Sequence, residues 1–340
     1  MPATVHETDV AIVGAGPVGL FAVFECGMLG LDCHLIDPLE AVGGQCVALY
    51  AEKPIYDIPA IPKLMANELI ERLAAQAAPF APVYHLSQQV VALEPDGRAW
   101  RLETSQGTCI EARAVMIAAG VGAFGPHRPP LAGIERFEGK SVFYMVARRE
   151  DFRDKRVVIA GGGDSALDWV LSLAEIAAKI YVVHRRPKFR GAPESVARMQ
   201  ALAETGAVVE IVVPYQLHAL EGRDGALEAV VVATRKGETR RLEADVLLPF
   251  YGLSMNLGPI ADWGLELEHH QIVVDPATCE TNNAGIFAIG DIASYPGKLK
   301  LILSGFSEAA MAAHAIYKLV HPDQELHWEY STTKGVPGLD

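Results

Sequence analysis

The chain has 340 residues, half of them hydrophobic, and a formal net charge of −13. This length is enough for two domains of ordinary size, and the acidity argues against nonspecific binding to nucleic acid or to an anionic membrane surface. We see neither an uncharged apolar stretch of about 18 residues nor a secretory signal, so we expect no membrane span and a cytoplasmic location.

The first predicted elements are a strand, a glycine-rich turn and a helix. The apolar run 10–13 precedes Gly14-Ala15-Gly16-Pro17-Val18-Gly19, and a helical pattern continues to Leu29, with Gly30 as its expected end. Glycines in this setting let the backbone approach a pyrophosphate at the helix N-terminus. The next apolar run, 33–36, ends in Asp37, 23 residues after Gly14. A carboxylate there can accept hydrogen bonds from ribose hydroxyls, which indicates a dinucleotide without a 2′-phosphate, such as FAD.

The next segment predicts a helix and a small antiparallel meander. Helical spacing covers 64–78, and short strands are expected at 89–94, 99–104 and 108–112, with Pro95-Asp96-Gly97 as the first turn. A separate apolar strand at 115–119 ends in Gly120. From there to residue 130 the chain is rich in glycine and proline, which indicates a crossover to a second domain.

A second glycine loop comes after another apolar run. Residues 157–160 precede Gly161-Gly162-Gly163-Asp164-Ser165-Ala166, and the matching strand 180–183 ends in His184, again 23 residues on. Arg185 and Arg186 come next. A guanidinium can bind a 2′-phosphate bidentately, whereas a carboxylate would repel it, so this loop predicts NADPH. The alternative for these arginines is a solvated basic run that continues through Lys188 and Arg190.

The last third of the chain predicts a return to the first domain. Strands at 208–213, 227–234, 239–242 and 246–250 are expected to complete the second domain. Residues 251–254 then form the return crossover. A strand at 285–289 then ends in Gly290-Asp291, and a helix over 307–320 comes after Gly305. The aspartate could bind a hydroxyl of the first cofactor, and the helix dipole could stabilise negative charge on it. The alternative is a simple turn and a packing helix.

These patterns predict an α/β fold with two Rossmann-like dinucleotide-binding domains, the first of them discontinuous. The expected divisions are 1–122 for the first part of the FAD-binding domain, 123–252 for the NADPH-binding domain and 253–340 for the second part of the FAD-binding domain. Residues 321–340 form a C-terminal tail.

Nearly the whole chain resembles the ferredoxin:NADP reductases of the thioredoxin-reductase-like type, which are flavoproteins. The resemblance rests on both glycine loops, on the strand ends at Asp37 and His184-Arg185-Arg186, and on these further segments: Gly43-Gly44-Gln45, Ala48-Leu49-Tyr50, Ile55-Tyr56-Asp57, Gly290-Asp291, Gly297-Lys298-Leu299-Lys300-Leu301-Ile302 and the tail. It implies FAD and NADPH as cofactors and a homodimer.

The resemblance also implies roles for particular residues. Tyr50 is expected to stack on one face of the isoalloxazine ring, and the tail, with Tyr330 and Ser331, on the other face, where the nicotinamide must arrive. Without the resemblance, Tyr330 would be interpreted as an ordinary surface residue. The expected FAD contacts are Gly14, Gly16, Gly19, Asp37, Gln45, Tyr50, Val90, Phe124, Asp291 and Thr332. The expected NADPH contacts are Gly161, Gly163, Ser165, His184, Arg185 and Arg186.

The cysteine pattern separates this chain from thioredoxin reductases proper, which carry a CxxC motif in the NADPH domain. The chain has five scattered cysteines, Cys26, Cys33, Cys46, Cys109 and Cys279, with no CxxC pair. Cys46 has Ala51 where a resolving thiol would be expected, so we interpret Cys46 as a buried apolar residue. Dithiol chemistry is excluded, single thiols fit a reducing compartment, and no metal site is predicted.

The implied function is an FAD-dependent oxidoreductase that transfers hydride between NADPH and FAD and single electrons between FAD and ferredoxin or flavodoxin. Two alternatives stay open: a reductase of quinones or other small acceptors, and a redox-sensing module that binds both cofactors. Because such carriers are usually acidic, basic side chains are candidate docking residues, or else solvated surface charges: Lys298, Lys300, Arg148 and Arg149.

Overall fold

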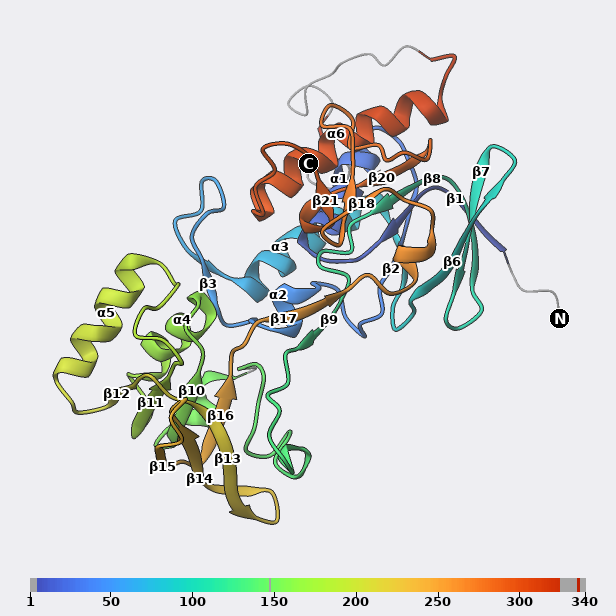
Figure 1. The fold of residues 1–340 in the computed structure, drawn as a ribbon. Helices are drawn as coiled ribbons and strands as arrows, with labels where there is room; N and C mark the ends of the chain where they lie inside the picture. The colour runs from blue at the N-terminus through green and yellow to red at the C-terminus, as the bar shows by residue number, and fades with distance from the viewer. Residues whose placement is uncertain (1–4, 147, 325–334, 337–340) are drawn as a thin grey trace. The chain divides into compact units, whose positions relative to one another are not determined.

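The computed structural model describes residues 5–146, 148–324 and 335–336, and it divides into two compact units. Unit 1 comprises Met1–Phe124 and Met255–Asp340, and unit 2 comprises Gly125–Ser254. The chain therefore leaves unit 1 and returns to it, as the colour gradient of Figure 1 shows. The two connecting segments contain β9 (Ala123–Pro126) and β17 (Leu253–Asn256), which pair with each other.

Unit 1 is built on a mixed sheet with strand order β5-β2-β1-β8-β7-β6, in which β20 also pairs with β8. Strands β5, β2, β1, β8 and β20 are parallel, whereas β8, β7 and β6 form an antiparallel meander. Its elements in chain order are β1 Val5–Val13, α1 Pro17–Met28, β2 Cys33–Ile36, α2 Gln45–Ala48, β3 Pro54–Ile55, β4 Leu64–Met65, α3 Ala66–Ala77, η1 Ala78–Phe80, β5 Val83–His85, β6 Val90–Asp96, β7 Ala99–Thr104, β8 Cys109–Ile117, η4 Gly258–Asp262, β18 Leu267–Glu268, β19 Gln271–Val273, β20 Ile286–Ala288, η5 Gly290–Ile292, β21 Ala293–Ser294 and α6 Ile302–Val320.

Two apolar layers stabilise unit 1, one on each face of the parallel strands. One layer packs Val10, Ile12 and Leu35 of the sheet against helices α1, α3 and α6. The other layer joins the opposite sheet face to the meander and to residues 257–293. Helices α1 and α6 lie against each other, with the rings of Phe21 and Phe306 centred 4.8 Å apart.

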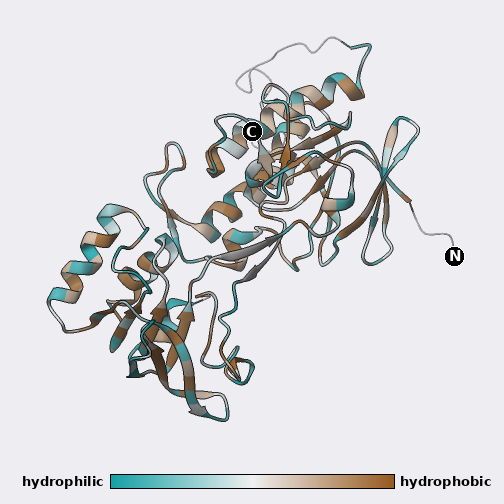
Figure 2. Ribbon diagram, viewed as in Figure 1, coloured by the Kyte–Doolittle hydropathy of each residue, from teal (hydrophilic) through white to brown (hydrophobic). Residues whose placement is uncertain are grey.

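Unit 2 combines a parallel sheet, β12-β11-β10-β16, with an antiparallel sheet, β13-β14-β15. In Figure 2 helix α5 is banded in teal and brown, whereas the strands beside it are mostly brown, as expected for an amphipathic helix over a buried sheet. Its elements are η2 Ile134–Arg136, η3 Arg149–Phe152, β10 Arg156–Ala160, α4 Asp164–Leu173, β11 Lys179–Val183, α5 Pro193–Glu204, β12 Val209–Val212, β13 Gln216–Arg223, β14 Ala226–Ala233, β15 Thr239–Glu243 and β16 Val246–Pro249.

The α/β fold class is confirmed, but two strands that the sequence predicts separately form a single strand in unit 1. The expected strands 108–112 and 115–119 form the single strand β8, whose first half pairs with β7 while its second half pairs with β20. The predicted turn at Pro95-Asp96-Gly97 is also misplaced. Pro95 lies inside β6, opposite Trp100, and β6 is an edge strand, where a missing N–H is tolerated.

Two further elements differ from the sequence prediction. Strand β13 was not predicted, because its residues alternate weakly between apolar and polar. Helix α6 begins at Ile302, five residues before the predicted start, and Gly305 lies inside its first turns. No side chain caps this helix at Leu301, so no N-cap residue marked its start. Among the described residues, no helix is long and apolar enough to span a membrane.

Gly305 lies where α6 packs tightly against Val18 of α1. A Cβ atom on Gly305 would lie 2.4 Å from Val18 Cγ2 and 3.4 Å from Gly290 Cα. We therefore expect Gly305→Ala to lower the free energy of unfolding by about 1 to 2 kcal/mol, because overpacking outweighs the gain in helix propensity. Chemical denaturation measures this. Ser307→Ala, at an exposed position of the same helix, is the control and should leave stability unchanged or slightly raised; equal stability of both variants would contradict the close contact.

Candidate functional site

The first glycine loop turns the chain sharply between β1 and α1. Gly14 has φ +113°, and its N–H donates to Ile36 O at 2.8 Å, which joins the loop to the end of β2. A Cβ atom on Gly14 would lie 2.4 Å from Ala118 O, and one on Gly19 would lie 2.0 Å from Gly14 O. Both glycines are therefore required for packing, whatever they bind.

Asp37 holds this loop from the end of β2. Its Oδ2 accepts a hydrogen bond from Ala15 N–H at 2.7 Å, and its Oδ1 accepts one from Leu39 N–H at 2.9 Å. Burial raises the pKa of Asp37, and these two backbone hydrogen bonds oppose that shift. Each carboxylate oxygen has a further lone pair, so Asp37 can orient the loop and still accept from a ligand hydroxyl.

A cavity of about 310 Å³ opens beside this loop within unit 1. Seven of the predicted FAD contacts line it: Gly14, Gly16, Asp37, Gln45, Tyr50, Val90 and Asp291. Gly19 is buried behind the loop and does not line the cavity. Phe124 belongs to β9, but its side chain lies outside the described part of the structure, as do Tyr330, Ser331 and Thr332 entirely.

The cavity wall fits a phosphate-bearing ligand at the loop. A Cβ atom on Gly16 would meet nothing within 4 Å, so the backbone at the N-terminus of α1 is open to close approach. Trp263 also lines the cavity, and its buried indole N–H has no hydrogen-bond partner among the described residues. Open backbone at a helix N-terminus, a carboxylate and an unpaired donor together suit a dinucleotide such as FAD.

Tyr50 and Cys46 form a second part of the same wall. The Cys46 thiol donates to Tyr50 Oη, with sulfur and oxygen 3.7 Å apart. Burial raises the pKa of both groups above their ordinary values, and the nearby carboxylate of Asp291 raises both further. Cys46 is therefore a protonated, buried thiol, as the sequence predicted, and it is not poised as a nucleophile.

The turn that carries Asp291 is held by a buried carboxylate that sequence reasoning missed. Glu308, on α6, accepts hydrogen bonds from Gly290 N–H at 2.7 Å and from the Tyr295 hydroxyl at 2.6 Å, and it forms an ion pair with Lys298. The Lys298 and Glu308 side chains are only 7% and 2% exposed. One feature of the sequence could have indicated this buried carboxylate, namely a single acidic residue among alanines on the apolar face of a helix.

The second glycine loop connects β10 to α4 in unit 2. A Cβ atom on Gly161 would lie 2.6 Å from Phe250 O, whereas one on Gly163 would meet nothing within 4 Å. Gly163 therefore leaves the N-terminus of α4 open, and Ser165 is exposed in the first turn. This loop has the same open backbone as the first one, which suits a second pyrophosphate.

The residues after β11 differ in chemistry from those after β2. The His184 ring lies against the loop, 2.5 to 2.7 Å from where a Gly162 Cβ would be, and stacks on Phe189 with centroids 5.1 Å apart. Burial lowers the pKa of His184, and Arg190 lowers it further. Arg185 and Arg186 are exposed and form no ion pair within the described chain, so both guanidinium groups are available to a phosphate.

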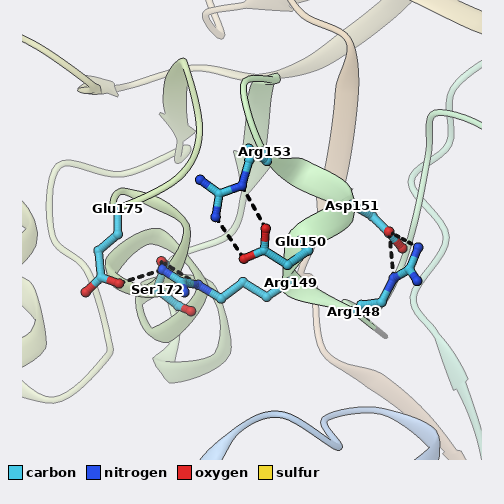
Figure 3. Close-up of polar contacts among 7 residues, drawn as sticks. All are labelled: Arg148, Arg149, Glu150, Asp151, Arg153, Ser172 and Glu175. Carbon is cyan, nitrogen blue, oxygen red and sulfur yellow. Dashed lines mark hydrogen bonds and ion pairs between the residues drawn. The ribbon is translucent and has the colours of Figure 1, made fainter.

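Three of the four predicted docking cations are already paired. Figure 3 shows Arg148 bound to Asp151, with nitrogen and oxygen 2.5 Å apart, and Arg149 bound to Glu175 and to the carbonyl oxygen of Ser172. Lys298 is buried against Glu308. Lys298 is therefore not a surface docking residue, because its side chain is only 7% exposed, whereas Arg148, with a side chain 71% exposed, and Arg149 stay candidate docking residues or solvated surface charges. Lys300 alone of the four is exposed and has no ion-pair partner in the described part of the chain.

Comparisons with known proteins agree with this geometry. The family model for pyridine nucleotide-disulphide oxidoreductases matches residues 8–315. A ferredoxin–NADP reductase from Paramagnetospirillum magneticum is 66% identical over 334 residues, which is 98% of this chain and 98% of that protein. A ferredoxin–NADP reductase from Rhodospirillum rubrum is 61% identical over 337 residues, which is 98% of this chain and 97% of that protein.

Solved structures of lower identity share the fold. The thioredoxin reductase of Lactococcus lactis has a TM-score of 0.79 at 23% identity, covering 93% of this chain and 99% of that one. A bacillithiol disulfide reductase from Bacillus cereus has a TM-score of 0.76 at 18% identity, covering 92% and 99%. These similarities establish a thioredoxin-reductase-like arrangement of elements and carry nothing about substrate.

The buried ion pair of Lys298 and Glu308 predicts that replacing either residue alone destabilises the protein more than replacing both together. We expect Glu308→Gln to lower the free energy of unfolding by about 3 to 5 kcal/mol, because it leaves the Lys298 ammonium buried without its counter-charge. Lys298→Met should have a comparable effect. The double variant should recover much of the loss, and chemical denaturation of all four proteins closes the cycle. Additive losses would show that the two charges do not depend on each other.

Proposed function

This chain belongs to the pyridine nucleotide-disulphide oxidoreductases and, within them, to the ferredoxin–NADP reductases, and on that basis we propose that it transfers electrons between NADPH and ferredoxin through bound FAD. One observation carries the assignment of the two cofactors. The first glycine loop is followed by a carboxylate that faces a cavity, and the second by two exposed, unpaired arginines. A 2′-phosphate is repelled by the first arrangement and bound by the second.

In this proposal the cavity of unit 1 holds FAD. Asp37 binds the ribose, the open backbone at Gly16 binds the pyrophosphate, and Tyr50 packs against the ring system. When bound, FAD accepts two electrons as a hydride and returns them singly, which is the conversion that a one-electron carrier requires. The N-terminus of α6 also reaches the cavity through Leu301 and Ile302, and its positive dipole end stabilises negative charge there.

The protein itself supplies binding, orientation and exclusion of water. Cys46 is buried and its thiol is protonated, and the sequence has no CxxC pair, so we assign no step to a dithiol. Glu308 fixes the turn of Gly290 and Asp291 through Gly290 N–H. The chemistry thus depends on how the cavity residues hold the cofactor.

The carrier would approach unit 1 near the start of α6. Leu299 is 61% exposed, Leu301 38% and Leu303 42%, and Lys300 lies among them. Leu301 is at once exposed and part of the cavity wall, so here the cavity reaches the surface of unit 1. A small apolar patch with one cation suits a transient contact with an acidic carrier.

The finer parts of the proposal rest on the resemblance. We include flavodoxin as a second carrier, a homodimer as the working assembly, and Tyr330, Ser331 and Thr332 as residues that cover the flavin. A cytoplasmic location is supported by five unpaired thiols. The assignment of residues 1–122 and 253–340 to FAD and of 123–252 to NADPH belongs to the same proposal.

The proposed function predicts that turnover depends on the protein carrier. Anaerobic oxidation of NADPH by the purified yellow protein should proceed with cytochrome c as final acceptor only when a low-potential ferredoxin is present. Flavodoxin in place of ferredoxin tests the second carrier. Fast turnover without either carrier would instead establish a reductase of small acceptors. Tight binding of both cofactors with negligible turnover under every condition would establish a sensing module.

Arg185 should select NADPH over NADH. We expect Arg185→Ala to raise the KM for NADPH by about 10-fold or more and to leave the KM for NADH nearly unchanged, because only the 2′-phosphate loses a charge-assisted hydrogen bond. Steady-state kinetics with both nucleotides measure this. The control is Arg198→Ala, an exposed arginine on α5, which should change neither value. Equal losses for NADPH and NADH would show that Arg185 does not bind the phosphate.

A further inference from the structure

Three histidines from separate parts of the sequence meet in unit 1. His6 lies on β1, His34 on β2 and His85 on β5, which are neighbours in the sheet. Each offers one ring nitrogen, and the three nitrogens lie within 4.8 Å of one another. His34 Nδ1 and His85 Nε2 are 3.0 Å apart, and the ring centroid of His6 lies 5.8 Å from that of His34 and 5.1 Å from that of His85.

The backbone holds His6 close to the other two. Strand β1 pairs with β8 in one register on both sides of Asp9, from Val5↔Cys109 to Val13↔Ile117. Two side chains attach the first half of β1 to the start of β2. Thr8 Oγ1 donates to Asp32 O at 2.9 Å, and Asp9 Oδ2 accepts from Asp32 N–H at 3.1 Å. The cluster is therefore positioned by strands rather than by a free loop.

The three side chains have the chemistry of metal ligands. His34 and His85 are buried, and His6 is half-buried, which leaves one side open to an incoming ion. Imidazole nitrogens are the commonest side-chain ligands of such ions, and three of them converge here from three neighbouring strands.

The spacing also suits a tetrahedral ion. Three histidine nitrogens at about 2.0 to 2.1 Å from Zn²⁺ lie roughly 3.4 Å from one another, with the fourth position left to water. His34 Nδ1 and His85 Nε2 now share a hydrogen bond at 3.0 Å, which a bound ion would replace, and rotation of the His6 side chain can bring in the third nitrogen. Such a site on β1, β2 and β5 would cross-link three strands that no disulfide connects.

We propose that His6, His34 and His85 form a binding site for one divalent transition metal ion, with Zn²⁺ as the preferred occupant. None of the three lines the cavity of unit 1, so this site is separate from the proposed flavin site. The two are nevertheless adjacent, because Asp37 N–H donates to His85 O at 3.1 Å. The ion would stabilise the strand ends that present Asp37, and the proposal goes beyond the electron-transfer function.

The first experiment measures Zn²⁺ alone. Full-length protein, purified without a polyhistidine tag and stripped with a chelator, is titrated with Zn²⁺ against a chromophoric competitor. We expect one tight site per chain. His6→Gln should weaken that site by about 100-fold or more, because even loss of an outer contact to a ligand costs 10- to 100-fold in affinity. His218→Gln, an exposed histidine on β13 of unit 2, is the matched control and should bind as the parent does.

A second measurement reports the ligands directly. Co²⁺ in place of Zn²⁺ should give the visible absorption of a four- or five-coordinate nitrogen-bound ion in the parent and in His218→Gln, and should lose it in His6→Gln. Absence of a tight site in the parent would overturn the proposal without reference to any variant. Unchanged binding by a folded His6→Gln protein would overturn it equally, and would leave the histidines as hydrogen-bonded packing. Because NADPH oxidation is not the readout, failure here is distinguishable from failure of the proposed function.

Discussion

The two hydrogen bonds that Asp37 accepts from backbone N–H groups determine the geometry of the cavity in unit 1. Through Ala15 the carboxylate fixes the glycine loop, and through Leu39 it fixes the chain that leaves β2. The backbone of the same residue is bonded to His85 O and to Gln88 N–H, so β5 is tied to the same point. One residue therefore aligns the turn, two strands and the N-terminus of α1, and the cavity forms where they meet.

Unit 2 repeats this plan without the acid, and in the proposed function this difference gives the second loop a different ligand preference. The His184 ring takes the place beneath the loop, which explains why Gly162 has no room for a side chain. Arg190 N–H then bonds to Gly162 O at 2.7 Å, so the basic run is attached to the loop by its backbone while the guanidinium groups of Arg185 and Arg186 remain exposed. In the proposed function the same fold thus excludes a 2′-phosphate beside one loop and binds it beside the other, because the residues after the second strand set the local charge.

Features that short sequence motifs mark were predicted from the sequence, whereas features that depend on contacts between residues far apart in the sequence were missed. Both glycine loops, Asp37 and the strand before Asp291 are marked by short patterns with a physical cause, and the structure brings Gly14, Gly16, Asp37 and Asp291 around one cavity. The start of α6 was missed because Leu301 offers no capping side chain, and because Gly305 is a packing residue rather than a boundary. Lys298 was predicted as a surface cation because nothing nearby in sequence shows that Glu308 faces it. The three histidines come from positions 6, 34 and 85, so no spacing rule could have joined them, and the expectation of no metal site considered cysteines alone.

The buried pair of Lys298 and Glu308 also changes how a carrier can be recognised. An acidic carrier meets a chain with a net charge of −13, so the charge of the whole chain does not favour its approach. Arg148 and Arg149 are paired with carboxylates, and Lys298 is held by Glu308 beside the turn of Asp291. Within unit 1 the segment around Lys300 offers a cation and exposed leucines at the place where the cavity wall reaches the surface. In the proposed function, recognition at this segment relies on short-range fit, which suits a partner that must bind, accept one electron and leave.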